Sequence, residues 1–292
     1  MQVPMNYKVI GNYFKNNSGK IELMALGSSQ MKCAFNPALS SKKAINFGSS
    51  SQHHNEDFEI LKGTIDRIPK LKYILMEVSF NHLELPHHPA DFWKNNVYLK
   101  YYNVNAFGRA TWFKDRLIYL SNPRFYSHKI FDYYFVKDEN ATLNKYGFYS
   151  NNFRGSFQLA NYDEKKIAAN VFRISNRADI TTLRKNSTYL FHMLDFMQQK
   201  NLTVIIATIP LYKTYVEKRK APIVNRRDSI LSIIKRKYKN VVILNEETDT
   251  LKFTVTDFLN ENHLNPYGAE KFTLLVNQKL DSLDQRFLNL PK

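Results

Sequence analysis

Two polar segments, far apart in the chain, carry residue types that could do chemistry together. The segment 257–269 places His263 among polar, turn-forming residues, just before an expected C-terminal helix. Near the other end, a Gly-Ser-Ser turn that contains Ser29 follows the apolar run 21–26. A serine at a strand-to-helix turn and a late histidine can form a nucleophile and its general base. The pair therefore indicates serine-dependent acyl transfer.

Short apolar runs separated by helix-length segments must position these residues. Such alternation predicts parallel strands joined by crossover helices, because buried parallel strands have apolar side chains on both faces. We therefore predict an α/β fold: one three-layer α/β/α domain with a mainly parallel sheet of about five strands. The expected strands are 21–26, 44–47, 73–78, 202–209 and 241–244, and the expected helices are 55–67, 181–200, 225–239 and 266–280.

The middle of the chain departs from this alternation. Residues 86–162 are rich in Tyr, Phe, Trp, Asn and Lys, without a clear period. A structureless loop of that length is uncommon in a compact domain, so we interpret the region as an inserted cap or side wall. Residues 1–20 are then an N-terminal lead-in, and 21–85 with 163–292 form the α/β/α domain. Aromatic faces in the insertion suit sugar rings, although such residues are also ordinary core material.

Composition restricts the class of protein. The chain has 292 residues, 43% of them hydrophobic, and a formal net charge of +16. The basic residues are dispersed along the chain, and a broadly basic surface favours a polyanionic partner. The sequence has no nucleic-acid-binding motif, so we expect no specific nucleic acid. The single Cys33 excludes an internal disulfide, and His87 with His88 lacks acidic or cysteine ligands at suitable spacing. We therefore expect no metal and no bound cofactor.

Four short motifs together resemble the SGNH (GDSL-like) hydrolase superfamily. The order of the motifs is similar to that of its bacterial polysaccharide-modifying branch, related to alginate-acetylation and D-alanine-transfer proteins. The matching segments are Gly27-Ser28-Ser29 after the first strand, Asn46-Phe47-Gly48 after the second, Asn81 after the third, and His263-Leu264-Asn265 with Gly268-Ala269 at the last helix.

The resemblance implies a role for each matched residue. Ser29 would be the nucleophile and His263 its base, with an acyl-Ser29 intermediate. The oxyanion hole would combine the backbone N–H groups of Ser29 and Gly48 with the Asn81 side chain. Asn81 could instead cap a helix, a position that asparagine often fills.

The implied function is acetyl transfer to, or acetyl removal from, a carbohydrate or polysaccharide in a bacterial surface-polysaccharide pathway. The sugar could be acidic, and the acyl donor could be acetyl-CoA or another acetyl carrier. No apolar run approaches the roughly 18 residues of a membrane span, and the first residues lack a signal peptide's apolar core. We expect a cytoplasmic protein as written, or a cell-envelope or periplasmic one if an N-terminal signal or anchor is missing.

One position departs from the family pattern. Asn260 stands three residues before the histidine, where the family has the aspartate that orients the base. Asp257 is the expected substitute acid, with Glu261 a weaker candidate. A Ser-His dyad without a carboxylate is a further possibility. The alternative from another class is a non-catalytic polysaccharide-binding or assembly protein that retains the fold.

Overall fold

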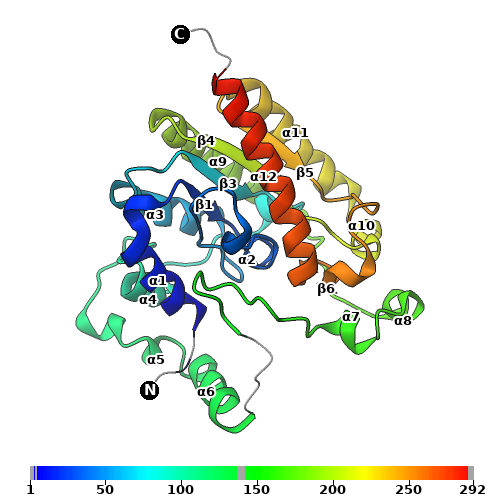
Figure 1. Ribbon diagram of the computed structural model, residues 1–292, viewed down its shortest axis with the longest axis horizontal. Coiled ribbons are helices and arrows are strands. Elements are labelled where there is room, and N and C mark those ends of the chain that lie inside the picture. Colours follow the sequence, from blue (N-terminus) through cyan, green and yellow to red (C-terminus); the bar gives the residue numbers. More distant parts are fainter. Residues whose placement is uncertain (1–2, 4, 137–141, 289–292) are drawn as a thin grey trace.

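A parallel sheet of five strands forms the centre of the protein (Figure 1). The computed structural model describes all residues except 1, 2, 4, 137–141 and 289–292. The strand order is β2-β1-β3-β4-β5, and every neighbouring pair is parallel. The strands are β1 (Leu23–Leu26), β2 (Ala44–Asn46), β3 (Tyr73–Glu77), β4 (Thr203–Thr208) and β5 (Val241–Asn245). All five predicted strands are confirmed, with ends that differ by one or two residues.

The helices match the predicted crossover pattern. Those that flank the sheet are α1 (Asn6–Asn17), α2 (Ser29–Ala34), α3 (His54–Thr64), α9 (Ile180–Gln199), α11 (Ala221–Lys237) and α12 (Pro266–Leu288). The others are α4 (Lys94–Tyr101), α5 (Ile118–Ser121), α6 (Pro123–Phe131), α7 (Ser156–Leu159), α8 (Glu164–Ala169) and α10 (Lys213–Lys218).

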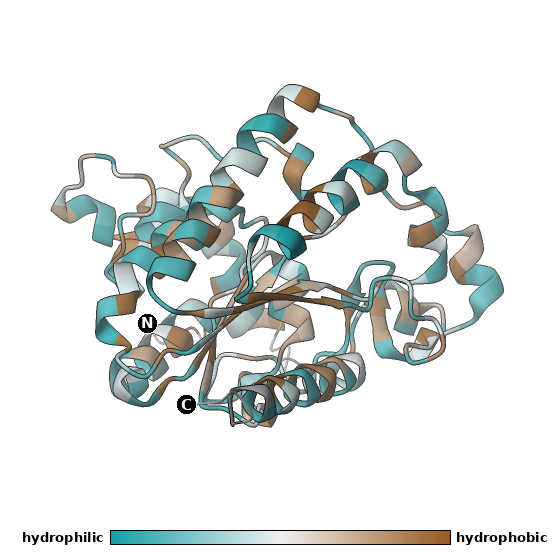
Figure 2. Cartoon of the chain, turned by 90° about the horizontal axis from the view of Figure 1, so that it is seen from above, coloured by the Kyte–Doolittle hydropathy of each residue, from teal (hydrophilic) through white to brown (hydrophobic). Residues whose placement is uncertain are grey.

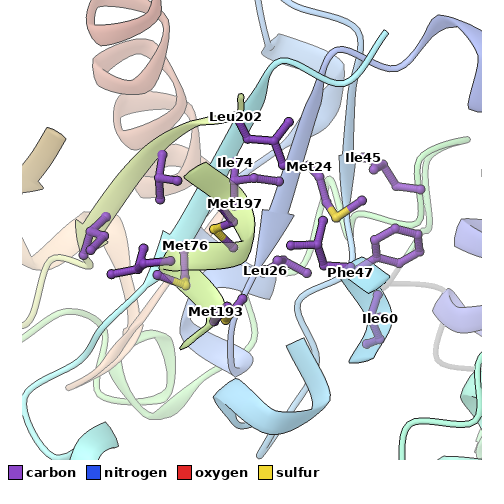
Figure 3. Packing of buried hydrophobic residues seen from close by; sticks show 14 of the residues in the cluster. Met24, Leu26, Ile45, Phe47, Ile60, Ile74, Met76, Met193, Met197 and Leu202 are labelled. Carbon is purple, nitrogen blue, oxygen red and sulfur yellow. The ribbon is translucent and has the colours of Figure 1, made fainter. Parts of the chain in front are cut away.

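Apolar side chains cover both faces of the sheet, which produces three layers. Viewed along the sheet, the strands are strongly apolar and helices lie on either side of them (Figure 2). Met24 and Met76 on one face pack in the same cluster as Met193 and Met197 of α9 (Figure 3). On the other face, Leu75 shares a cluster with residues of α2 and α12. The predicted α/β/α class is therefore confirmed.

The region between β3 and β4 contributes no strand to the sheet within its described residues. It is nevertheless not a simple cap. Val97 and Tyr98 of α4 are fully buried in the same core cluster as the sheet, and α4 packs on α1. Helices α5 and α6 lie farther out, at the bottom of Figure 1. Among the described residues, no helix is both long and apolar enough to cross a membrane.

The strand order defines where a site can form. From β1 the chain moves to β2 on one side, whereas β3 and β4 follow on the other side. At such a switch point the loops after neighbouring strands diverge, which leaves a crevice at their carboxyl ends. The loops after β1 and β3 meet there.

Candidate active site

The turn after β1 presents Ser29 at the start of α2. Gly27 has a φ of 145° and a Cβ at this position would lie 2.7 Å from the Glu77 Cβ, so only glycine fits. Ser28 caps α2, because its Oγ accepts the Gln30 N–H. Ser29 is the first residue of the helix, so its own N–H has no acceptor within the helix.

A buried carboxylate holds this turn in place. Glu77, at the carboxyl end of β3, is fully buried. It accepts the Ser28 N–H at 2.8 Å, the Ser28 hydroxyl at 2.8 Å and the Met31 N–H at 3.1 Å. The Ser79 hydroxyl donates to it at 2.9 Å. Burial raises the pKa of Glu77, while these hydrogen bonds act in the opposite direction. The parallel pairing of β1 with β3 thus fixes the backbone on both sides of Ser29.

His263 comes from a small hairpin that precedes α12. Strands β6 (Phe258–Asn260) and β7 (His263–Leu264) are antiparallel, and Asn260 pairs directly with His263 across them. The three-residue spacing therefore places the two side chains next to each other. Asn265 fixes the start of the helix, because its Oδ1 accepts the Tyr267 N–H at 2.9 Å while its amide donates to the Thr256 carbonyl.

The hairpin and the nucleophile turn meet in a hydrogen-bonded chain of three side chains. His263 Nε2 lies 2.8 Å from Ser29 Oγ, and His263 Nδ1 lies 3.0 Å from Asn260 Oδ1. Asn260 Oδ1 also accepts the backbone N–H of Asn262 at 3.1 Å. Because a backbone N–H can only donate, it identifies this atom as oxygen. His263 then carries its proton on Nδ1, and its Nε2 lone pair faces the serine hydroxyl.

The charge state of the histidine follows from its surroundings. Burial, with a further contribution from the positive charge of Lys32, lowers the pKa of His263 to about 4. Asn260 supplies an acceptor but no negative charge to oppose that shift. His263 is consequently neutral near pH 7, which is the form that can accept a proton.

A cavity of about 270 Å³ opens beside the serine. It is lined by Ser28, Ser29, Gln30, Ser51, Gln52, His53, Ser79, Phe80, Asn81, His82, Leu85, Ser175, Tyr215 and Asn262. None of these lining residues is Lys, Arg, Asp or Glu, although the chain as a whole has 68 such residues. Burial lowers the pKa of His53 to about 3 and that of His82 well below its usual value. The cavity is therefore polar but uncharged.

The structure corrects the prediction that Asp257 substitutes for the missing acid. The Asp257 carboxylate accepts the Thr254 N–H at 2.8 Å and pairs with Lys271 at 2.7 Å. It closes the turn before β6 and makes no contact with His263. Glu261 does not replace it either, because His263 Nδ1 is bonded to Asn260. The position beside the histidine is occupied by Asn260 alone.

The structure also corrects the role expected for the Gly48 backbone. The Gly48 N–H donates to Asn46 Oδ1 at 2.8 Å, and Gly48 is not among the residues that line the cavity. Three residues further on, Ser51 lines the cavity with a left-handed φ of 56°. No hydrogen bond joins the Ser51 N–H to another described residue. The sequence places three serines after Gly48 but does not specify the left-handed φ of Ser51.

Asn81 lies in the cavity wall after β3, as expected. Its side-chain amide donates one hydrogen to the Ser175 carbonyl at 3.0 Å, and its side chain does not cap the 3-10 turn that follows. A primary amide has two hydrogens, so one remains for another acceptor. Its part in an oxyanion hole stays a prediction.

Five of the seven other histidines gather at the cavity, and two of them, His53 and His82, line it. The rings of His53, His54, His82, His87 and His88 lie near one another, with ring centroids 4.3 to 6.1 Å apart in the neighbouring pairs. His88 is bonded to Glu56 at 3.1 Å, and His54 to the Glu77 carbonyl at 3.0 Å. Across the described ranges, no group of three or more His, Cys, Asp or Glu side chains is arranged to hold a metal ion.

Comparisons with known proteins give only distant similarities. No family model matches the chain, and no curated protein matches it. Among solved structures, a putative platelet activating factor from Streptococcus pneumonia is 9% identical, with a TM-score of 0.45, over 94% of this chain and 92% of that one. A GDSL-like lipase from Bacteroides thetaiotaomicron is 8% identical, with a TM-score of 0.44, over 94% and 99%. A catalytic mutant of an acetylxylan esterase from Geobacillus stearothermophilus is 11% identical, with a TM-score of 0.40, over 89% and 94%.

Proposed function

We propose that this protein is a serine-dependent acyltransferase or esterase that acts on a carbohydrate, with acetyl as the acyl group and Ser29 as the nucleophile. The observation that supports this most directly is the 2.8 Å contact between Ser29 Oγ and the unprotonated Nε2 of His263. A neutral histidine in the correct tautomer at hydrogen-bond distance is what general-base activation of a hydroxyl requires.

The reaction would proceed in two steps. His263 Nε2 takes the Ser29 hydroxyl proton as Oγ bonds to the acyl carbon. The tetrahedral intermediate then expels its leaving group, which receives that proton from His263. In the second step a sugar hydroxyl or water gives its proton to His263 and attacks the acyl-Ser29 ester. Ser29 Oγ leaves and regains the proton, so both the serine and the histidine return to their starting state.

The negative oxygen of each intermediate needs donors near Ser29. The backbone N–H of Ser29 is the first candidate, because it begins α2 without an acceptor in that helix. The N–H of Ser51 is the second, since it lies at the cavity and is unbonded within the described residues. The free hydrogen of the Asn81 amide would be the third.

The lining of the cavity favours the sugar over a charged or wholly apolar substrate. Hydroxyl, amide and neutral imidazole groups can hydrogen-bond sugar hydroxyls in either direction. Phe80 and Tyr215 add aromatic surface, with ring centroids 5.9 Å apart. The cavity offers no cation for a carboxylate or sulfate group, so the part of the substrate that enters it would be uncharged. A role in bacterial surface-polysaccharide modification belongs to this proposal.

A serine-reactive phosphonate tests the nucleophile. We expect one adduct by intact-protein mass, located on Ser29, and none in Ser29→Ala. The control is Ser229→Ala, which removes an exposed hydroxyl from α11 and should label like the native protein. His263→Ala should slow labelling and hydrolysis of an acetyl ester by at least about 100-fold, because the general base is lost. Absence of any adduct on the native protein would instead favour the non-catalytic polysaccharide-binding alternative.

A further inference from the structure

Exposed apolar side chains are concentrated in one part of the insertion, residues 109–136, which we call the aromatic arm. Of the eighteen large hydrophobic side chains that are exposed among the described residues, ten lie in this arm. Phe113 is 80% exposed, Phe135 72% and Trp112 70%. Single exposed apolar residues need no explanation, but such a concentration on a folded protein indicates a partner or a membrane.

Basic residues accompany these side chains. Lys114, Arg124 and Lys129 are exposed, and none has an acidic side chain within salt-bridge distance in the described part of the chain. The arm has only two acidic residues, Asp115 and Asp132, and Asp115 is buried with its carboxylate 3.0 Å from Arg109. The arm therefore presents aromatic groups and unpaired positive charges together.

A groove beside the arm has the same combination. It holds about 340 Å³ between the N-terminal segment, α4 and helices α5 and α6. Its walls include Ile118, Tyr126 and Ile130, while Lys8, Lys100 and Lys129 also line it. An apolar trough edged by ammonium groups matches a molecule with a hydrocarbon part and an anionic head.

We infer that the aromatic arm is a docking surface for an anionic lipid bilayer. Tyr and Trp side chains prefer the interface between headgroups and hydrocarbon, and Lys and Arg are attracted to acidic headgroups. Helices α5 and α6 lie at the outer edge of the molecule, away from α11 and α12 (Figure 1). Contact through this edge would leave the central sheet and the Ser29 cavity free. The inference is independent of the proposed acyl transfer.

Vesicle flotation tests this surface with the whole chain. We expect the native protein to float with phosphatidylglycerol-containing vesicles and to bind pure phosphatidylcholine at least tenfold more weakly. The triple variant Trp112→Ser, Phe113→Ser, Phe135→Ser should lose at least tenfold in partitioning, and so should Lys114→Gln, Arg124→Gln, Lys129→Gln. The matched control is Val171→Ser with Leu251→Ser, which removes side chains 91% and 94% exposed outside the arm and should partition like the native protein.

A second measurement distinguishes lipid from protein partners. Trp112 is one of only two tryptophans, and its fluorescence should shift to the blue and be quenched by brominated lipids when vesicles are added. Equal binding to neutral vesicles, loss of binding in the control, or no binding would overturn the inference. A native dimer that the aromatic triple variant converts to a monomer, without a lipid-dependent Trp112 signal, would assign the arm to self-association and would also overturn it. Circular dichroism of each variant confirms that the fold is retained.

Discussion

The two loops that meet at the candidate site are anchored in opposite ways. The nucleophile turn rests on a fully buried carboxylate, Glu77, which accepts hydrogen bonds from Ser28 and Met31. The histidine hairpin rests on an amide, Asn260, which accepts the His263 Nδ1–H but has no charge. The chain therefore has a buried carboxyl group beside its serine and only a neutral amide behind its histidine. A triad acid both orients the histidine and balances the positive charge of the imidazolium. Asn260 orients His263 but does not balance that charge.

Restoring the charge should have the largest effect. Asn260→Asp would keep the acceptor at Nδ1 and add a carboxylate that stabilises the imidazolium formed during transfer. Replacing a triad aspartate by asparagine costs about 10⁴ in rate, partly because the histidine adopts the wrong tautomer. His263 already has the correct tautomer, so we expect a smaller gain in kcat for acetyl-ester hydrolysis, about 10- to 100-fold.

Thr256→Asp is the control for this gain, because it adds the same charge to an exposed position just before the hairpin, outside the cavity lining. It should change kcat much less than Asn260→Asp does. An equal gain in both variants would mean that the basicity of His263 is limited by the electrostatic potential of the whole site and not by the group that contacts Nδ1. No gain in either variant would mean that charge behind the base is not limiting.

The pH dependence of kcat/KM should also differ between the native protein and Asn260→Asp. The reactive form of His263 is neutral, so a pKa of about 4 keeps it reactive as the pH falls through 6.5. We expect kcat/KM of the native protein to stay level from pH 8 to about pH 5, with an acidic limb near pH 4. In Asn260→Asp the new carboxylate raises the histidine pKa, so this limb should move to higher pH. A native limb near pH 6.5 would contradict the burial argument.

Disturbing the other anchor should have a moderate effect. Glu77→Gln replaces one acceptor oxygen by an NH₂ group, so at least one buried donor from Ser28, Met31 or Ser79 loses its partner. Leaving one such group unsatisfied costs about 1–3 kcal/mol of stability. We expect a fall of that size in the free energy of unfolding measured with urea. We also expect roughly a tenfold fall in kcat, because a displaced turn would no longer align Ser29 with His263. KM should change less.

Glu270→Gln is the matched control, since Glu270 is an exposed residue of α12. It should leave both stability and kcat near the native values. A Glu77→Gln protein that loses stability but keeps its full kcat would show that Glu77 supports the fold without positioning Ser29.

The sequence predicted the sheet well because buried parallel strands are almost continuous apolar runs. It also predicted which two distant residues meet, since the ends of parallel strands share one edge and the order of motifs placed Ser29 and His263 there. The sequence does not reveal Glu77 as an anchor, because two of its partners, Ser28 and Met31, lie far away in the chain, in the turn after β1 and in α2. Its role becomes visible only when the pairing of β1 with β3 is known.

The wrong predictions concern backbone direction and loop geometry. Gly48 was expected to offer its N–H to the site, but the Asn46 side chain turns back and accepts it. The choice between Asp257 and Asn260 depended on where the hairpin begins, which spacing alone does not specify. The predicted bounds of the insertion stay a prediction, and within them α4 carries Val97 and Tyr98, which are buried in the main core.

Asp257→Asn should have the smallest effect on activity, and it tests whether the histidine hairpin depends on any carboxylate of its own. The Asp257 side chain accepts from Thr254 and pairs with Lys271, which is 45% exposed. An exposed partner limits the ion pair's contribution, so we expect at most about 1 kcal/mol of lost stability. The Asn260 contact to His263 is untouched, so kcat should stay within about twofold of the native value and the pH profile should not move. If kcat instead fell by 100-fold or more, Asp257 would be acting on the base from a rearranged hairpin, and the contrast between a serine turn anchored by a carboxyl group and a histidine hairpin anchored by an amide would fail.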